Sequence, residues 1–403
     1  MDHGTGSGVG GEGPIRVMVV DDSAVVRGLI SRMIESSSDM KVVASVGNGQ
    51  LAISTLERSD IEVVILDIEM PVMDGLTALP KLLKVDPDLV VIMASTLTLK
   101  NADISLRALD AGAADYVPKP TSSREISGGD EFKRELVEKV RALGTRRRNK
   151  KGGRVTSGAP APSSSTGSSS GPVGARTVGG GASAPAATGL SPSHGKLYTG
   201  SQITLRPLGN DAPDVIAIGS STGGPQALFA VLGAIKPGSI RQPILITQHM
   251  PATFTTILAE HLTRVSGWKA AEGVDGEVIQ SGRIYLAPGD NHMVVEQRGA
   301  ERVIRLNKNP PENFCRPAVD PMFRSIAAAY GRRVLAVVLT GMGSDGAKGG
   351  QVVTAAGGTV VAQDEATSVV WGMPGATATS GVCSAVLPLP EIAPFIIRQA
   401  QRR

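Results

Sequence analysis

Ser221 lies in a segment whose spacing is suited to presenting a nucleophile. The run Gly219-Ser220-Ser221-Thr222-Gly223 has the G-x-S-x-G spacing that places a serine on a sharp turn between a strand and a helix. Glycines on both sides remove Cβ atoms that would clash in such a turn, and the hydroxyl is left exposed above the helix N-terminus. A phosphate-binding loop is the competing interpretation. It is disfavoured because neither the G-x-G-x-x-G nor the P-loop spacing occurs here.

A serine nucleophile needs a base, and the chain has five histidines. Four of them have ordinary interpretations: His3 lies in the N-terminal tail, His194 in a Gly-rich segment, His261 inside an expected helix, and His292 at the start of an expected strand. His249 instead stands at the carboxyl end of an expected strand, in Thr247-Gln248-His249-Met250-Pro251. We expect this strand to lie beside that of Ser221, so His249 is the best candidate for the base.

The carboxylate that would orient the base is expected at a third strand end. Asp345 follows the apolar run 334–339 in a turn rich in glycine, and the backbone N–H groups of 341–343 are candidates for stabilising an oxyanion. A helix N-cap is the alternative role for Asp345, and both roles can hold together. The resulting order Ser, His, Asp differs from the Ser, Asp, His order of α/β-hydrolases, so that fold is disfavoured.

A second group of chemical side chains lies near the N-terminus. Asp21 and Asp22 follow the first expected strand and Asp67 follows the third, so three carboxylates would converge on one pocket. Such a cluster favours a hard cation such as Mg²⁺. Ser95 and Lys119 follow the next two strands and would supply a hydroxyl and a positive charge to a phosphoryl group on Asp67. Each residue taken alone has a capping or surface interpretation.

Two blocks of alternating strands and helices position these residues, and this alternation predicts an α/β protein. The first block has expected strands at 15–20, 42–46, 63–66, 90–93 and 114–117, which predict a doubly wound sheet of five parallel strands. The clearest strands of the second block are 215–218, 244–247, 283–286 and 334–339. We expect a Rossmann-like α/β domain with a mainly parallel sheet.

A segment of low complexity separates the blocks. Between 152 and 195, 33 of 44 residues are Gly, Ser, Ala or Pro, which predicts a flexible linker. We therefore expect a first domain at 14–132, a linker at 145–210 and a second domain at 211–403. The basic run 146–154 is interpreted as a solvated helix end, with an anionic docking site as the weaker alternative.

Composition excludes several classes of protein. The 41 Lys and Arg residues nearly balance 37 Asp and Glu residues, so the net charge of +4 gives no argument for nucleic acid or a membrane surface. The two cysteines, Cys315 and Cys383, show neither a zinc spacing nor a disulfide framework. We see no signal peptide and no apolar run of about 18 residues, so we expect a cytoplasmic protein with no direct membrane insertion.

The first block resembles the response-regulator receiver family. The resemblance lies in Val19-Val20-Asp21-Asp22-Ser23, in Leu66 to Pro71 with Met73-Asp74-Gly75, and in Tyr116-Val117-Pro118-Lys119-Pro120. It implies that Asp67 accepts phosphate from a histidine kinase of the chemotaxis type. It also implies that Asp22, Asp67 and the carbonyl of Glu69 hold Mg²⁺ with Asp21 nearby, and that Ser95 and Tyr116 reorient on phosphorylation.

The second block resembles the chemotaxis protein-glutamate methylesterase family. The matching stretches span most of 214–380: 218–224, 246–251, Tyr285 to Asp290 with His292-Met293, Arg316 to Asp320, 339–346 and Trp371 to Pro374. The family's catalytic serine, histidine and aspartate fall at Ser221, His249 and Asp345, and no cofactor is implied for the esterase reaction.

This second resemblance implies a substrate and a mode of control. The substrate is the methyl ester of glutamate side chains on the cytoplasmic domains of chemoreceptors, and many members also deamidate receptor glutamines. The unphosphorylated receiver is expected to cover the catalytic face, and phosphorylation to relieve it. The alternatives are a phosphorylation-controlled adaptor and a related methylesterase outside chemotaxis. A DNA-binding regulator is disfavoured, because 211–403 has no resemblance to a helix-turn-helix.

Overall fold

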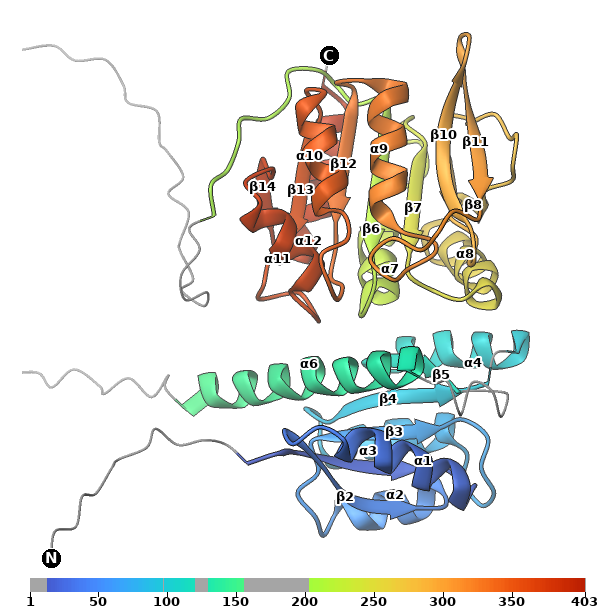
Figure 1. The fold of residues 1–403 in the computed structure, drawn as a ribbon, viewed down its shortest axis with the longest axis vertical. Helices are drawn as coiled ribbons and strands as arrows, with labels where there is room; N and C mark the ends of the chain where they lie inside the picture. Colours follow the sequence, from blue (N-terminus) through green and yellow to red (C-terminus); the bar gives the residue numbers. More distant parts are fainter. Residues whose placement is uncertain (1–12, 97, 120–129, 156–202, 403) are drawn as a thin grey trace, which may run out of the picture.

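The computed structural model describes residues 13–96, 98–119, 130–155 and 203–402, which fold into two α/β domains (Figure 1). The N-terminal domain contains the predicted receiver and the C-terminal domain the predicted esterase. None of the helices in the described ranges has the length and hydropathy needed to span a bilayer.

The N-terminal domain is built on a parallel sheet with the strand order β2-β1-β3-β4-β5. Its strands are β1 (Ile15–Val20), β2 (Met40–Val46), β3 (Val63–Asp67), β4 (Val90–Ser95) and β5 (Asp115–Pro118). The strand order reverses at β1, so β1 and β3 flank a crevice beyond their carboxyl ends. The predicted doubly wound sheet of five strands is confirmed.

Short polar side chains begin the first four helices of this domain. These helices are α1 (Ala24–Glu35), α2 (Gly49–Leu56), α3 (Gly75–Val85) and α4 (Leu99–Asp110). Each N-cap side chain accepts a hydrogen bond from a backbone N–H of the first turn, and the four caps are Ser23, Asn48, Asp74 and Thr98. The last described helix of the domain is α6 (Asp130–Val155).

The predicted start of the linker at residue 145 is wrong, because α6 continues to Val155. The buried carboxylate of Glu62 explains the extension. Arg147 donates to the carbonyl oxygen of Glu62 at 2.6 Å, and Arg148 donates to its carboxylate at 2.6 Å. Burial opposes ionisation of Glu62, but the hydrogen bonds from Arg148 and from the backbone of Arg16 outweigh it and hold the pKa of Glu62 below its usual value. These two arginines are therefore not part of a solvated helix end.

The other end of the predicted linker also needs correction. Residues 203–210 run along the C-terminal domain, where Arg206 N–H donates to the carbonyl of Cys383 at 2.8 Å. Gly209 N–H donates to Thr359 Oγ1 at 3.1 Å. This segment belongs to the C-terminal domain. The domain therefore begins before residue 211, its predicted start. The central part of the predicted linker, 156–202, lies outside the described residues.

The C-terminal domain is built on a parallel sheet with the order β14-β13-β12-β6-β7-β9-β8. Its strands are β6 (Val215–Ser220), β7 (Ile244–Gln248), β8 (Lys269–Glu272), β9 (Arg283–Leu286), β12 (Val334–Val338), β13 (Thr359–Gln363) and β14 (Ala385–Leu387). A separate antiparallel hairpin joins β10 (His292–Arg298) to β11 (Glu301–Asn307). The predicted Rossmann-like arrangement is confirmed.

Helices cover both faces of this sheet. One face packs on α7 (Gly224–Ala234), α8 (Ala252–Ser266) and α12 (Leu389–Ala400). The other face packs on α9 (Val319–Tyr330), α10 (Ala347–Ala355) and α11 (Gly372–Thr379). Alternate residues of β6 divide between these cores, with Ile216 and Ile218 in the first and Val215 and Ala217 in the second.

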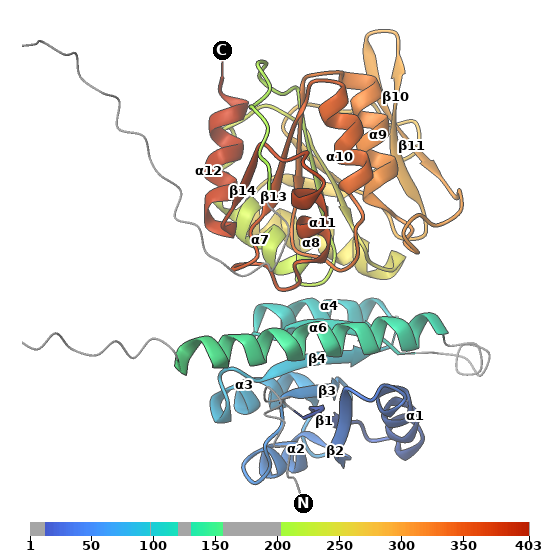
Figure 2. The same ribbon diagram turned by 60° about the vertical axis from the view of Figure 1, so that its left-hand side comes forward.

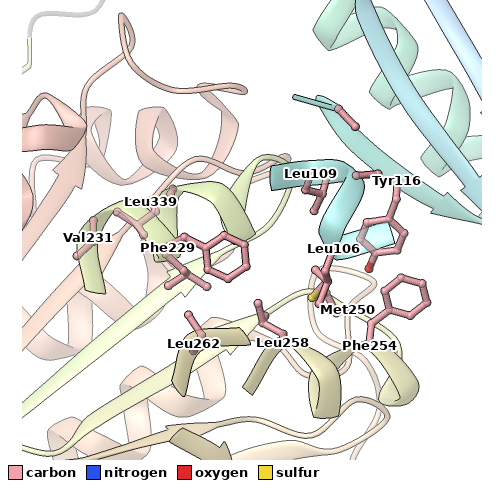
Figure 3. Packing of buried hydrophobic residues seen from close by; sticks show 14 of the residues in the cluster. Leu106, Leu109, Tyr116, Phe229, Val231, Met250, Phe254, Leu258, Leu262 and Leu339 are labelled. Atoms are coloured by element: carbon pink, nitrogen blue, oxygen red, sulfur yellow. The ribbon is translucent and has the colours of Figure 1, made fainter. Parts of the chain in front are cut away.

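Helices α4 and α6 of the receiver face the C-terminal domain (Figure 2), and the contacts between the domains come from α4, from α6 and from Tyr116 of β5. Helix α4 packs against α7 and α8. Leu106 and Leu109 of α4 and Tyr116 of β5 belong to the same buried apolar cluster as Phe229 and Phe254 of the C-terminal domain (Figure 3). The centre of the interface between the domains is therefore formed by a continuous cluster of apolar side chains.

Candidate active site

Three neighbouring strands position Ser221, His249 and Asp345. Strand β6 lies between β12 and β7 and pairs with both in parallel. Ser221 follows β6, His249 follows β7, and Asp345 lies in the turn after β12. Because the strands are parallel, their carboxyl ends meet at one edge of the sheet. The predicted adjacency of the Ser221 and His249 strands is confirmed.

The turn that carries Ser221 depends on glycine. Gly223 has a φ of 72°, in the left-handed region, and caps the start of α7. A Cβ atom on Gly224 would lie 2.0 Å from Oε1 of Gln248, so this position has no room for a side chain. Gln248 Nε2 donates to the carbonyl oxygen of Ser221 at 2.9 Å. The β7 strand end therefore helps to fix the backbone of the serine turn.

Asp345 is held by hydrogen bonds along both carboxylate oxygens. Oδ2 lies 2.8 Å from Nε2 of His249 and accepts from the backbone N–H of Val319 at 2.6 Å. Oδ1 accepts from Asn313 Nδ2 at 3.0 Å and from the backbone N–H of Asp320 at 2.9 Å. Burial opposes ionisation of Asp345, but these hydrogen bonds and the adjacent His249 lower its pKa below the usual value.

The side chain of Asp320 caps the start of α10 with more hydrogen bonds than that of Asp345, for which capping is the predicted alternative role. Its Oδ1 accepts from the backbone N–H groups of Gly346 and Gly349 at the start of α10, at 3.0 and 2.6 Å. Asp345 Oδ1 also accepts from Gly346 at 3.0 Å. Burial and the neighbouring charge of Asp345 raise the pKa of Asp320. Asp345 thus shares the capping of α10 while its other oxygen faces His249.

The second ring nitrogen of His249 faces a cysteine. Nδ1 lies 3.3 Å from Sγ of Cys315. Among the described residues no hydrogen bond joins the hydroxyl of Ser221 to His249. Burial opposes protonation of His249, but the electrostatic interaction with Cys315 and hydrogen bonds to Asp345 and Cys315 outweigh it and raise the pKa of His249 to about 10. The ring is therefore held between a carboxylate and a sulfur atom.

A cavity of about 460 Å³ joins this site to the receiver. The C-terminal domain contributes Ser221, His249 and Cys315 to its lining. The receiver contributes Tyr116 and Lys139, so the cavity lies between the domains. Of the predicted oxyanion donors, Gly341 N–H is already bonded to the carbonyl of Val370 at 3.1 Å, whereas Met342 and Gly343 line the cavity.

The acidic cluster of the receiver assembles as its sequence predicts. Carboxylate oxygens of Asp21, Asp22 and Asp67 lie within 4.8 Å of one another. Lys119 Nζ contacts Asp21 at 2.5 Å and Asp67 at 2.6 Å. Burial raises the pKa of Asp67 above its usual value despite the opposing effect of Lys119. Three converging carboxylates are a donor set that fits a divalent cation such as Mg²⁺.

Comparison with known proteins identifies the family. A model described as "CheB methylesterase" matches residues 216–396, and one described as "Response regulator receiver domain" matches 17–128. The chain is 64% identical over 390 residues to a "Protein-glutamate methylesterase/protein-glutamine glutaminase 1" of Paramagnetospirillum magneticum, an alignment that covers 96% of this chain and 97% of the relative. The chain belongs to the CheB methylesterase family.

Two further relatives are similar to this CheB-family chain. A protein of the same name from Rhodospirillum rubrum is 61% identical and aligns over 97% of this chain and 96% of its own length. The crystal structure of the Thermotoga maritima CheB methylesterase catalytic domain is 39% identical, with a TM-score of 0.45, and covers 46% of this chain and 98% of that one. The family and the hydrolase class predicted from the motifs are confirmed.

The remaining predicted receiver residues of this CheB-family chain are spread around the cluster. Ser95 is buried, and its hydroxyl accepts from Ser105 of α4 at 3.0 Å. Tyr116 points into the interface between the domains, where its ring stacks on that of Phe254 (Figure 3). The exposed side chain of Glu69 pairs with Lys100 at 2.9 Å, and the role of its backbone carbonyl stays a prediction.

The other histidines have structural surroundings. His261 Nε2 lies 3.1 Å from a carboxylate oxygen of Asp103 across the domain interface. His292 is buried, and its Nδ1 accepts from the backbone N–H of Ala318 at 3.2 Å. His3 and His194 lie outside the described residues.

Sequence reasoning missed three residues that contact the site. Asn313 donates from its side-chain amide to Asp345, Sγ of Cys315 faces His249, and Asp320 donates from its backbone N–H to Asp345. Asp320 belongs to a motif that carried the family resemblance, which was the available signal. Cys315 was considered only as a partner for disulfides or zinc. Asn313 lies in an irregular loop with a φ of 51°, where no periodic pattern indicates which side chains face inward.

Proposed function

We propose that this chain is a phosphorylation-regulated methylesterase that hydrolyses glutamate methyl esters on the cytoplasmic domains of chemoreceptors, and that it deamidates receptor glutamines by the same route. The observation that carries the proposal is that adjacent strand ends bring Ser221 and His249 to the lining of one cavity, with the carboxylate of Asp345, from a third strand end, against His249. The names of the curated relatives support the same substrates and both reactions.

The proposed mechanism assigns one task to each residue. His249 accepts the proton of the Ser221 hydroxyl through Nδ1, because Nε2 is engaged with Asp345. The serine oxygen attacks the ester carbonyl, and the protonated ring then gives its proton to the departing methoxide, which leaves as methanol. Water, deprotonated by His249, cleaves the acyl-serine to release glutamate. An amide substrate follows the same steps with ammonia as the leaving group.

Backbone contacts prepare Asp345 for its task in this mechanism. The carboxylate can only accept hydrogen bonds, so it fixes the proton of His249 on Nε2 and leaves Nδ1 as the acceptor. The N–H groups of Val319 and Asp320 keep the carboxylate ionised and in place. Met342 and Gly343 remain the proposed N–H donors to the oxyanion.

Control is proposed to come from the receiver. In the docked arrangement Tyr116 and α6 form one wall of the cavity, which restricts the approach of a large protein substrate. Phosphorylation of Asp67 by a histidine kinase would weaken this docking through Ser95, which is bonded to Ser105 of α4, and Tyr116, which packs in the interface. Such control requires only that docking be weaker in the phosphorylated state.

A divalent cation has a place in this control. Asp21, Asp22 and Asp67 would hold Mg²⁺, with the carbonyl of Glu69 as a further proposed ligand. Bound there, the ion would neutralise the negative charge of the phosphoryl group. Lys119 of this chain already supplies one positive charge to the same carboxylates. The esterase site is proposed to need no cofactor.

Replacing the proposed nucleophile tests the function. A Ser221→Ala chain should release no methanol from a methylated chemoreceptor cytoplasmic fragment, with its thermal unfolding unchanged. Ser220→Ala is the matched control, because Ser220 is the adjacent serine and its hydroxyl bonds to Gln248 rather than facing the cavity. The Ser220→Ala substitution should reduce methanol release by less than tenfold. Substantial release by Ser221→Ala would leave the adaptor as the better hypothesis.

A further inference from the structure

The thiol of Cys315 and the hydroxyl of Ser221 both require Nδ1 of His249 as their hydrogen-bond acceptor. In the proposed mechanism Nδ1 of His249 must accept the serine proton, since Nε2 is committed to Asp345 at 2.8 Å. A ring nitrogen has one lone pair and accepts one hydrogen bond in this direction. In the structure that position faces Sγ of Cys315 at 3.3 Å. A thiol is a stronger acid than an alcohol, so it competes well for the base.

The loop that carries Cys315 is fixed on the side of the active site. Backbone hydrogen bonds of 3.1 and 2.9 Å join Glu312 and Cys315 in both directions. Asn313 has a φ of 51° and bridges Asp320 and Asp345 with its amide nitrogen, at 3.1 and 3.0 Å. Movement of this loop would therefore move the contacts of His249 and Asp345 together.

The same loop touches the receiver on its outer side. Phe314, between Asn313 and Cys315, has a φ of 64°, which is uncommon for a bulky residue. Phe314 is 73% exposed, and the guanidinium of Arg134 from α6 lies over its ring, 4.2 Å from the ring centroid. One loop thus contacts the catalytic base with one residue and the docked receiver with the preceding one.

We propose that Cys315 is a positioning residue that withholds His249 from Ser221 while the receiver is docked. The thiol occupies Nδ1 in the docked chain, and undocking of α6 frees the loop so that Nδ1 can turn to the serine. The proposal rests on the proposed function and deepens it: docking inactivates the base as well as covering the cavity.

The kinetic test uses the full chain with Cys315→Ala and Cys315→Ser. Methanol release from a methylated chemoreceptor cytoplasmic fragment is measured without and with a small phosphoryl donor and Mg²⁺. Cys315→Ala should raise the unphosphorylated kcat at least threefold with KM changed less than twofold, and should change the phosphorylated kcat less. Cys315→Ser, which keeps a weaker donor, should give an intermediate kcat. Cys383→Ala is the control because Cys383 is buried in the core. Its kcat and KM should equal those of the parent chain.

A second measurement reads the hydrogen bond without relying on activity. In chains labelled with ¹⁵N at histidine, the Nδ1 resonance of His249 should shift in Cys315→Ala and stay in place in Cys383→Ala. An unchanged resonance, or an unphosphorylated kcat that is unchanged or reduced in Cys315→Ala, would overturn the proposal. If methanol release proves independent of Ser221, the proposed function fails instead, and the resonance still decides whether the thiol holds the ring.

Discussion

The rings of Tyr116 and Phe254 stack across the domain interface, with centroids 4.4 Å apart and planes inclined by 8°. Tyr116 lies on β5, shortly before Lys119, which pairs with Asp21 and Asp67, and Phe254 lies in the first turn of α8, a few residues after His249. This pair therefore links the predicted switch of the receiver to the helix beside the candidate base.

Loss of this stacking should weaken docking. A buried aromatic pair is worth about 0.5–1.5 kcal/mol beyond its burial. Phe254→Leu keeps an apolar side chain but loses the pair, so unphosphorylated methanol release should rise roughly two- to tenfold. Phe323→Leu makes the same change in the core on the opposite face of the sheet and should not raise it. Equal rates for the two variants would contradict the prediction.

Removal of Asp67, the proposed phosphoacceptor, should uncouple control from catalysis. Asp67→Asn keeps the size of the side chain but cannot form an acyl phosphate. Methanol release by this variant should show no increase on addition of a small phosphoryl donor, whereas the parent chain should respond. An Asp60→Asn chain is a suitable control, since Asp60 is exposed and pairs with Arg16 away from the cluster. A full response in Asp67→Asn would place the phosphoryl group elsewhere.

Chelation of divalent cations should affect the two domains differently. The carboxylate cluster of Asp21, Asp22 and Asp67 lies in the receiver domain, whereas the esterase strand ends lie in the C-terminal domain. Excess EDTA should therefore remove the increase caused by the phosphoryl donor and leave unstimulated methanol release within twofold. Adding back Mg²⁺ should restore the increase. Loss of unstimulated release under EDTA would show that the esterase itself needs a metal.

Asp345 should matter for kcat far more than for substrate binding. An asparagine at this position can donate to the ring and favours the wrong tautomer of His249. Asp345→Asn should therefore lower kcat by roughly 10³- to 10⁴-fold. Asp364→Asn, in the turn after β13, should change kcat less than twofold. A small effect of Asp345→Asn on kcat would remove Asp345 from the mechanism.

The raised pKa of His249 predicts how the stability of the folded chain depends on pH. Because the pKa rises from 6.5 unfolded to about 10 folded, the folded chain binds this proton more tightly. The contribution to the free energy of unfolding is fully present below pH 6.5 and is lost as pH rises through about 10. The groups that face the ring nitrogens are the carboxylate of Asp345 and Sγ of Cys315.

A comparison with His249→Gln isolates this contribution. The difference in urea-unfolding midpoint between the parent chain and His249→Gln should be larger near pH 6.5 than near pH 10. His261→Gln is the control, because His261 pairs with Asp103 instead. A difference for His249→Gln that does not change with pH would contradict the assigned direction of the shift.

The site residues at strand ends were predictable because the alternation of apolar runs and amphipathic stretches along the sequence shows where each strand ends. Ser221, His249 and Asp345 each come directly after an apolar run, and parallel strands bring such positions to one edge. Asn313 and Cys315 were not predictable as site residues. They reach His249 and Asp345 from an irregular loop whose positive φ angles follow no hydrophobic period.

The extent of α6 was equally hidden from composition. Residues 145–155 look like the beginning of a polar linker, since they are rich in Arg, Lys and Gly. What keeps them helical is distant in the sequence, because Arg147 and Arg148 contact Glu62 and Asp86. Long-range ion pairs of this kind have no local signature.

The continuous α6 helix decides where this chain can be divided. A receiver fragment cut at residue 144 would lose Arg147 and Arg148, leave the carboxylate of Glu62 with Arg16 but without Arg148, and so be destabilised. A fragment that ends at residue 155 would keep both. For the same reason, chimeras that exchange receivers between family members should carry α6 along with its own sheet. The exchangeable unit is the receiver together with its long helix.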